Sequence, residues 1–260
     1  MFNLEKLKYF LVKSPLGKYI RITQNVFLVL KIKKNKKDAV KTVYCISPFK
    51  TGTTFLTGAF NSKVSKHEPI HFTTYKLLNT NFNKYFAKRM NYLNLKLECS
   101  GFWSAYIDQL AKNKVARDLE YVCILRSPSS WVTSVINYWN KPSMLEFNFD
   151  NALEFFWKDK VGVDLCAFDF KSNTVENQQI IDKLVKFYFN FTKKTKKLKN
   201  ITYIKLREVE EKISVVESLI DEKAAVGNSW KRKNKNKKWV YKNEKIDEQY
   251  WQLTNELYNS

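Results

Sequence analysis

The chain has 260 residues, of which 44% are hydrophobic and 15% are aromatic. This composition can bury one sizeable α/β core and excludes a wholly disordered chain. The formal net charge of +21 indicates an anionic partner, such as a nucleotide, a polyanionic substrate, nucleic acid or an acidic membrane surface, unless the lysines are simply spread over solvated faces.

The sequence shows neither a signal peptide nor a membrane span. Glu5, Lys6 and Lys8 stand where a signal peptide needs its apolar region, and "VFLVL" at 26–30 is far shorter than the roughly 20 residues of a span. The four cysteines have no C-x-x-C spacing and no nearby histidine cluster, so we expect neither a disulfide framework nor a metal site. We therefore expect a soluble, cytoplasmic protein, with peripheral membrane contact still open.

The chain divides into a lead-in and a single domain. Residues 2–12 carry apolar side chains at helical spacing and 31–41 form a basic loop, so we assign 1–40 to an amphipathic, basic lead-in. The first core strand is "TVYCISPF", 42–49, and a helix is predicted over 53–63. The domain proper spans 41–260.

Predicted strands and helices alternate through this domain. The further segments are a helix over 73–90, a β run over 93–100, a helix over 103–113, a buried strand over 119–127, a serine-capped helix over 129–139, a strand–helix unit over 200–220 and a helix over 245–258. Such alternation predicts an α/β fold with a mostly parallel central sheet and helices on both faces.

The turn after the first strand, "SPFKTGTT" at 47–54, has the composition of an anion-binding loop. Its candidate cradle of backbone N–H groups consists of Thr51, Gly52, Thr53 and Thr54. The glycine lets the backbone approach a ligand, and Lys50 can reach a phosphate-like oxygen. The order G-x-x-x-x-G-K-[ST] of nucleotide triphosphatases is absent. Taken alone, the segment could also be an ordinary turn with a threonine N-cap.

A second anion-binding segment, "CILRSPSSWVTS", follows the buried strand. Arg126 stands at the strand's end, and Ser134 lies about two turns into the next helix. A guanidinium fork and a hydroxyl suit one phosphate group, although an arginine that caps the sheet edge would give the same pattern. Two phosphate sites at successive strand ends suggest a nucleotide that carries a phosphate at both ends.

Together, these segments resemble the sulfotransferases. "SPFKTGTTFL" is similar to the family's 5′-phosphosulfate loop, P-K-S-G-T-T-W, and "VCILRSPSSWVTS" to its 3′-phosphate motif. "AVGNSWKRK", 225–233, is similar to the late segment that closes over the 3′-phosphate, and "ITYIKLREVEE" to a strand that ends in an acidic pair. The likeness runs from about residue 41 to the C-terminus, in the family's order.

The resemblance implies a P-loop-like fold and transfer of a sulfuryl group from 3′-phosphoadenosine 5′-phosphosulfate (PAPS) to an acceptor, with adenosine 3′,5′-bisphosphate (PAP) as product and no metal. The acceptor would be a hydroxyl or amine, with carbohydrate favoured. Lys50 would neutralise the leaving phosphate oxygen, where charge develops. The implied PAPS contacts are Lys50, Thr51, Gly52, Thr53, Thr54, Phe55, Arg126, Ser134, Trp230, Lys231 and Arg232.

The acceptor must also lose a proton, so a general base is needed close to the sulfur. The segment "KHEPIHFTTY" resembles the glutamate-containing region of glycan sulfotransferases and supplies His67, Glu68 and His71. We expect Glu68 to be the base, with His67 as its rival. The alternative is a polar surface loop with a solvated glutamate.

Several other residues have two interpretations each. "LECSGFW", 97–103, is similar to the family's E-K-[ST]-P-x-Y stretch, but Cys99 replaces the lysine and Gly101 the proline. Glu98 would face the site or lie at the edge of the core. Phe55 would stack near the adenine or belong to the core. Sugar stacking, an aromatic acceptor or plain core would each suit the tryptophans outside the motifs, Trp103, Trp139 and Trp157.

Two other functions remain open. A nucleotide-dependent, kinase-like phosphoryl transferase would need magnesium and an aspartate at a strand end, which "LEYVCILRS" does not supply. A non-catalytic binder of nucleic acid or acidic lipid would gather its lysines on one face. Here the only dense block is "KRKNKNKK", 231–238, so we expect no nucleic-acid partner.

Overall fold

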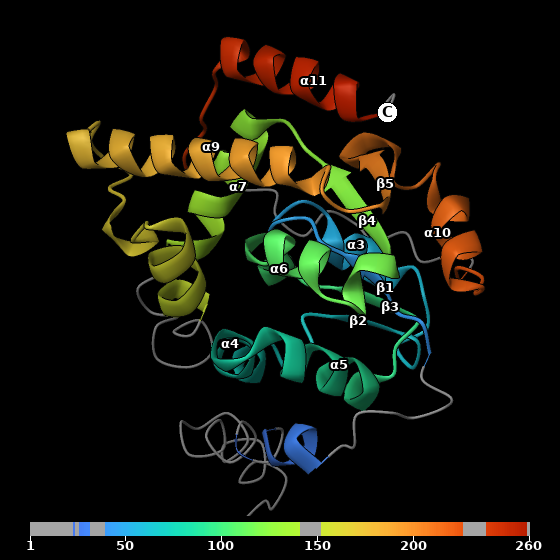
Figure 1. The fold of residues 1–260 in the computed structure, drawn as a ribbon. Coiled ribbons are helices and arrows are strands. Elements are labelled where there is room, and N and C mark those ends of the chain that lie inside the picture. The colour runs from blue at the N-terminus through green and yellow to red at the C-terminus, as the bar shows by residue number, and fades with distance from the viewer. Residues whose placement is uncertain (1–22, 24–25, 32–39, 141–151, 226–237, 259–260) are drawn as a thin grey trace, which may run out of the picture.

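A computed structural model describes residues 23, 26–31, 40–140, 152–225 and 238–258 (Figure 1). Its centre is a sheet of five strands in the order β2-β3-β1-β4-β5, in which every pair of neighbours is parallel. The strands are β1 Val43–Cys45, β2 Ser65–His67, β3 Leu97–Cys99, β4 Glu120–Leu125 and β5 Asn200–Lys205. The predicted α/β sheet is confirmed, and in the described part of the chain it is parallel throughout.

Helices connect the strands. They are α3 Thr53–Gly58, α4 His71–Thr80, α5 Phe82–Leu93, α6 Ile107–Lys112, α7 Pro128–Trp139, α9 Val175–Thr195, α10 Ile213–Ile220 and α11 Glu244–Tyr258. A π-helix spans Leu153–Val161, and 3₁₀ turns include Gly101–Ala105. None of the described helices is both long and apolar enough to cross a membrane. The helix predicted over 2–12 lies outside the described residues.

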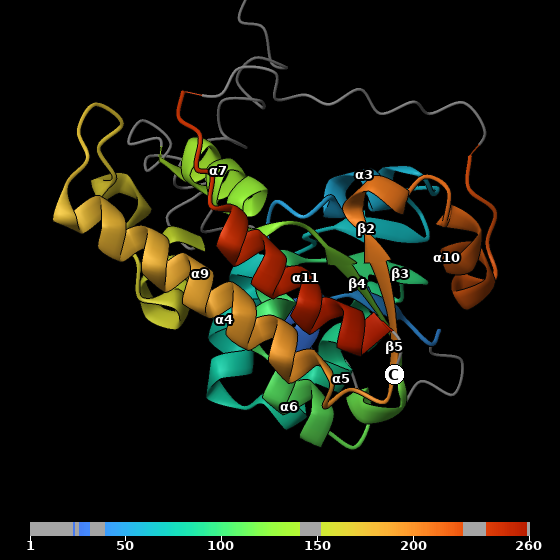
Figure 2. The same ribbon diagram turned by 90° about the horizontal axis from the view of Figure 1, so that it is seen from above.

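The sheet is buried on both faces because its side chains alternate between two cores. On β1, Tyr44 faces one core, while Val43 and Cys45 face the other. The first and larger core packs α4 to α7, α9 and α11 against the sheet, and the second packs α3 and α10 (Figures 1 and 2). The near-continuous apolar sequence of β4 is what a strand covered on both faces requires.

The larger core is rich in aromatic rings. Trp103, Trp139 and Trp157 are at most 5% exposed, so their core interpretation is confirmed. Trp131 stacks on Tyr188 with ring centroids 4.3 Å apart, which joins α7 to α9. Aromatic pairs of this kind contribute about 0.5–1.5 kcal/mol beyond the area they bury.

Several element boundaries differ from the predictions. The predicted helix over 73–90 is two helices, because Asn81 is extended at φ −160° and its side chain accepts a hydrogen bond from the Lys84 N–H as the N-cap of α5. The helix predicted over 53–63 ends at Gly58. Strand β2 lies in a segment interpreted as a loop, and α9, with 21 residues, was not predicted.

The start of α7 also differs from the prediction. The N-cap residue Ser127 makes no side-chain capping bond. Instead the Ser129 N–H donates to Oδ1 of Asp247 at 2.8 Å, and the Ser129 hydroxyl and the backbone N–H of Asn243 are hydrogen-bonded at 2.9 Å. A carboxylate from α11 therefore takes the place of the predicted serine cap, and the C-terminal helix is tied to α7.

Gly101 is required by the close approach of the loop that follows β1. A Cβ at this position would lie 2.6 Å from the backbone nitrogen of Phe49 and 2.5 Å from its ring. We expect Gly101→Ala to lower the free energy of unfolding by about 3 kcal/mol, near the upper end of overpacking effects, because one clashing atom is backbone. Urea denaturation followed by tryptophan fluorescence measures this difference.

Gly162→Ala is the matched control. A Cβ at Gly162 meets nothing within 4 Å, and only its φ of +79° opposes a side chain, which costs about 1 kcal/mol. Equal losses for the two variants would contradict the steric role of Gly101.

Candidate functional site

The carboxyl ends of β1 and β4 form a topological switch point. These strands are neighbours, yet the chain leaves β1 for α3 on the face of the second core and leaves β4 for α7 on the face of the first. In open parallel sheets, ligands bind in the crevice that such diverging connections leave outside the strand ends. The two predicted anion-binding segments, 47–54 and 126–134, therefore flank this switch point, and the space between them is called the crevice below.

The loop after β1 is fixed by hydrogen bonds to its carbonyls. The Thr51 hydroxyl donates to the carbonyl of Pro48 at 2.7 Å, and the buried indole N–H of Trp131 donates to the carbonyl of Phe49 at 2.8 Å. The loop thus keeps its shape through contacts with the protein's own core. A preformed loop costs little reorganisation when it binds charge.

Arg126 joins the two segments across the crevice. Its Nη1 donates to the Lys50 carbonyl at 2.5 Å, and its Nε and Nη2 donate to Oγ of Ser130 at 3.0 and 2.8 Å. The Tyr188 hydroxyl donates to the Arg126 carbonyl at 3.0 Å and holds the backbone. Ser134, which is predicted to bind the same phosphate as Arg126, lies one turn beyond Ser130 on the same side of α7, and that role stays a prediction.

Gly52 makes the turn from the loop into α3. It has φ +105°, and a Cβ there would lie 2.5 Å from Cδ1 of Leu206, so both its backbone and its surroundings demand glycine. No side-chain capping bond is formed at the start of α3, which argues against the alternative of a simple threonine cap.

Thr53 and Thr54 contact a histidine. Their hydroxyls lie 3.1 and 3.2 Å from Nε2 of His67, which ends strand β2. The predicted base segment therefore meets the predicted phosphosulfate loop. These bonds also restrain the imidazole ring of His67.

Lys50 extends toward the same place. Its backbone has φ +70°, an uncommon conformation for a residue other than glycine that functional sites often retain. Its Nζ lies 3.7 Å from the ring centroid of Tyr138 on α7. The positive charge also lowers the pKa of Glu68, so the ammonium group and this carboxyl group are close enough to interact.

Glu68 is the titratable group that the site perturbs most clearly. Loss of solvation on burial raises the pKa of its carboxyl to about 8, while Lys50 and a hydrogen bond from the Gly101 N–H act in the opposite direction. Its side chain keeps 19% exposure, and Oε1 lies 3.7 Å from Nε2 of His67. This carboxyl therefore holds a proton near neutral pH yet remains accessible, which is the condition for proton transfer.

The remaining predicted residues fall into three groups. Phe55 is half-buried against the second core, so its core interpretation is confirmed while stacking on a base stays a prediction. Glu98 is 1% exposed and pairs with Arg89, so it does not face the crevice. Trp230, Lys231 and Arg232 lie outside the described residues.

Sequence reasoning missed three side chains around this site. They are Ser130, Tyr138 and Arg89. The first two follow a helical spacing, with Ser130, Ser134 and Tyr138 on one side of α7. That period was available in the sequence. No local signal marks Arg89, because its partners come from β3 and from the loop before α4.

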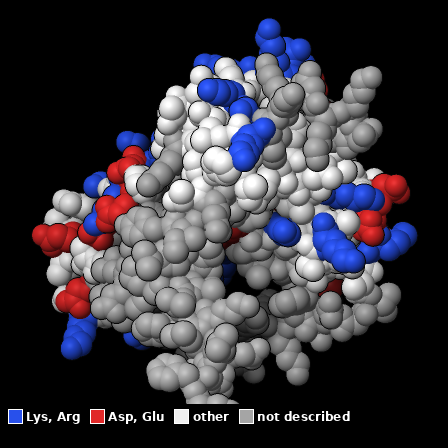
Figure 3. Space-filling model, turned by 90° about the horizontal axis from the view of Figure 1, so that it is seen from below, with Lys and Arg blue, Asp and Glu red and all other residues white. Residues whose placement is uncertain are grey.

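Figure 3 shows how the described positive side chains are distributed on one face of the molecule. On the face in Figure 3 they form separate groups, several of which adjoin Asp or Glu. Elsewhere in the described chain, Lys194 and Lys197 both contact Asp108 at 2.6 Å. The described residues of this face do not form the continuous basic patch that a nucleic-acid or lipid binder would present.

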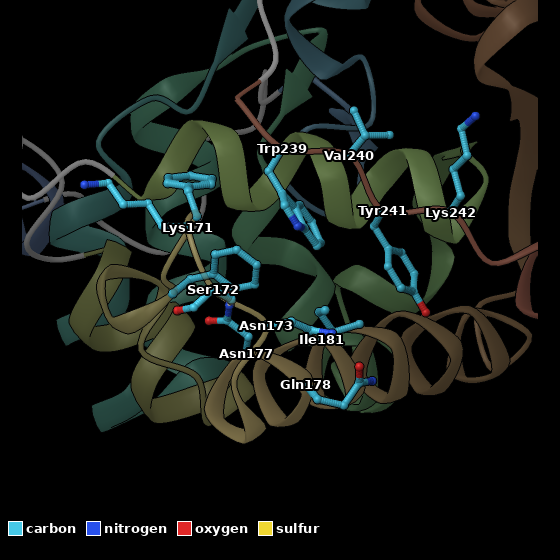
Figure 4. Close-up of a pocket in the computed structure, with 12 residues that line it drawn as sticks. Lys171, Ser172, Asn173, Asn177, Gln178, Ile181, Trp239, Val240, Tyr241 and Lys242 are labelled. Carbon is cyan, nitrogen blue, oxygen red and sulfur yellow. The ribbon is translucent and has the colours of Figure 1, made fainter.

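A concavity lies between α9 and the segment that carries Trp239. It measures about 470 Å³ and is lined by Phe168, Phe170, Lys171, Ser172, Asn173, Asn177, Gln178, Ile181, Trp239, Val240, Tyr241 and Lys242 (Figure 4). The irregular segment that carries Trp239 is hydrogen-bonded to Asn137 of α7. Asn177 of α9 is 3% exposed, and its side-chain amide is hydrogen-bonded to backbone groups of Asp169 and Ser172 in the preceding loop. The residues that line this groove include none of the predicted site residues around Lys50.

Comparisons of the chain with protein-family models, with curated proteins and with solved structures found no match in any of the three. Within the described residues, no three His, Cys, Asp or Glu side chains gather as a metal site would require. The description of the crevice therefore depends on its own geometry.

The raised pKa of Glu68 predicts a specific pH dependence of stability. Its ordinary value is 4.5 and its folded value about 8, so between these pH values the folded chain holds a proton that the unfolded chain has lost. Stability from this group is present below pH 4.5 and declines as pH rises toward about 8. We expect Glu68→Gln to gain on the wild type, by up to a few kcal/mol, between about pH 5 and 8.

Urea denaturation at several pH values measures that gain, with Glu217→Gln as the control. A backbone N–H of Ala224 and the Lys223 ammonium lower the pKa of Glu217, so its carboxylate is ionised over this range in both states. The free energy of unfolding of Glu217→Gln should therefore change with pH in the same way as that of the wild type. A Glu68→Gln curve that also runs parallel to the wild type would contradict the assignment.

Proposed function

We propose that this protein is a sulfotransferase, which moves a sulfuryl group from PAPS to a hydroxyl or amine of an acceptor, and that its parallel sheet has the P-loop-like arrangement of that family. The observation that carries the proposal is the meeting of Lys50, Arg126 and Glu68 at one switch point. They come from three segments that the sequence predicted separately as phosphosulfate loop, 3′-phosphate motif and base.

In this proposal the loop after β1 and Lys50 hold the 5′-phosphosulfate. When the sulfur–oxygen bond to the phosphate breaks, negative charge develops on the leaving phosphate oxygen. The Lys50 ammonium group lies 3.7 Å from the centroid of the Tyr138 ring. By moving off this ring, the ammonium group would be able to neutralise the leaving oxygen. The fixed loop presents its backbone dipoles with little reorganisation. Such preorganised dipoles supply most of the electrostatic stabilisation of a charged transition state.

Arg126 and the serines of α7 would hold the 3′-phosphate. The guanidinium already meets Ser130 through two nitrogens, and Ser134 lies one turn further along the same side of the helix. Because Arg126 also bonds to the Lys50 carbonyl, the two phosphate sites would be mechanically linked. Binding at one site would then help to order the other.

Glu68 is the better candidate for the base. As the acceptor oxygen attacks sulfur, its proton would pass to the Glu68 carboxylate, the new S–O bond would form, and PAP would leave with the electron pair of the broken bond. A pKa of about 8 makes this carboxylate a stronger base than an ordinary glutamate. His67 is instead engaged with Thr53 and Thr54, which suits a role in orienting the loop.

A carbohydrate is the favoured acceptor class. This preference for carbohydrate depends on the likeness of the segment around Glu68 to glycan sulfotransferases. The tryptophans buried in the core do not support it. The acceptor would have to enter beside Glu68, whose side chain is 19% exposed. The aromatic groove of Figure 4 shares no lining residue with the predicted site and is not assigned to the acceptor.

Nucleotide binding gives the direct test. We expect PAP without metal to raise the melting temperature in a thermal-shift assay, and ATP with magnesium to have a smaller effect. Lys50→Ala and Arg126→Ala should each weaken PAP binding about 10-fold or more, since a charge-assisted contact is worth about 1.5–3 kcal/mol.

Lys171→Ala is the matched control, because Lys171 is exposed and lines the aromatic groove. It should bind PAP like the wild type. Absence of a PAP shift would overturn the nucleotide site, while preference for ATP with magnesium would favour phosphoryl transfer. Equal weakening by all three lysine and arginine changes would favour non-specific attraction to the basic surface.

Proton transfer is tested separately. In a radiosulfate transfer assay over sugars, phenols and peptides, kcat/KM should rise with pH through the titration of Glu68, which has a pKa of about 8 in the unliganded chain. Glu68→Gln should lower transfer about 10²-fold or more and abolish that rise, with PAP binding intact. Unchanged transfer by this variant would exclude Glu68 as the base.

A further inference from the structure

A buried ion pair lies behind the candidate site. Arg89 on α5 and Glu98 on β3 are joined through two nitrogen–oxygen contacts of 2.5 and 2.8 Å, and their side chains are only 3% and 1% exposed. Apolar residues would often stabilise such a position as well or better. The pair therefore suggests a task other than stability.

The guanidinium of Arg89 makes a further contact with the loop that carries Glu68. Its Nη2 donates to the carbonyl of Pro69 at 2.9 Å. Pro69 lies between Glu68 at φ +49° and Ile70 at φ +46°. Two such residues around a proline form a strained backbone, which persists only when neighbouring groups hold it.

Glu98 holds the neighbouring segment, which follows β3 and contacts the Glu68 side chain. Its Oε1 accepts hydrogen bonds from the Ser100 hydroxyl at 2.8 Å and from the Trp103 indole at 2.9 Å. These residues flank Gly101, whose N–H bonds to the Glu68 carboxyl. One ion pair thus restrains both the backbone beside Glu68 and the segment that donates to its side chain.

We propose that Arg89 is a positioning residue, which through the carbonyl of Pro69 holds the Glu68 carboxyl against Lys50 in the reactive geometry. This inference rests on the proposed function for its catalytic meaning. Its structural content, that the guanidinium sets the environment of Glu68, does not depend on the reaction.

Arg89→Lys is the most informative variant. It keeps a positive charge for Glu98 but loses the planar fork that reaches the carboxylate and Pro69 together. We expect kcat to fall about 10- to 100-fold with KM for PAPS unchanged, as a misplaced catalytic group produces. Val216→Ala, on α10 in the second core, is the control for general destabilisation and should leave kcat unaltered at temperatures where it is folded.

A second readout needs no activity. The chain has two histidines, so NMR can follow the ring of His67, assigned with His71→Gln, as Glu68 titrates 3.7 Å away. The charged or titratable groups around Glu68 are Lys50, His67, Tyr75 and Tyr138. In Arg89→Lys we expect the inflection due to Glu68 to move toward the ordinary carboxyl range, and in Val216→Ala to stay.

Should Arg89→Lys fail to fold, the double variant Arg89→Met with Glu98→Gln replaces it. It buries no charge, and the glutamine oxygen can still accept from Ser100 and Trp103, so the contact with Pro69 is the main loss. If the Glu68 inflection seen at the His67 ring does not move in a folded variant, the positioning role is overturned. If the wild type transfers no sulfuryl group but the Glu68 inflection still moves in the variant, only the proposed function is overturned.

Discussion

The parallel direction of all five strands is the constraint from which the site follows. Because every carboxyl end meets the same edge, the segments after β1, β2, β3 and β4 converge there, although they are far apart in the sequence. The reversal of connections between β1 and β4 then opens a crevice at that edge. Arg126 crosses it to the Lys50 carbonyl, and Glu68 enters from the neighbouring side of the sheet.

Strain around the crevice is held by buried contacts. Lys50, Glu68 and Ile70 all have positive φ, and each such residue costs about 1–3 kcal/mol. The buried pair of Arg89 and Glu98 supplies the opposing hold, and loss of one buried partner typically costs about 3–5 kcal/mol. The buried ion pair therefore stabilises the strained conformation of the loop around Pro69, through the contact of Arg89 with the Pro69 carbonyl.

Much of the fold could be predicted from the periodicity of the chain. The apolar run that became β4, the strand before "SPFKTGTT" and the helix over α7 have unambiguous local patterns, and the structure confirms them. The failures have local causes as well. Asn81 is a capping signal that divides the predicted helix over 73–90, β2 has only three residues, and the apolar residues of α9 recur at helical spacing although no helix was predicted there. The serine cap of α7 failed because Asp247, from a distant helix, supplies the acceptor.

The candidate site divides along the same line. The sequence by itself determined which segments are candidates for binding an anion and for supplying a base, because a glycine beside a lysine in one turn, an arginine at a strand end and a glutamate between two histidines are local features. Only the tertiary structure decided that Ser130 meets Arg126, that Glu98 is buried with Arg89, and that burial raises the pKa of Glu68. Solvation and contact depend on residues brought together from separate strands, and no single stretch of the chain contains that information.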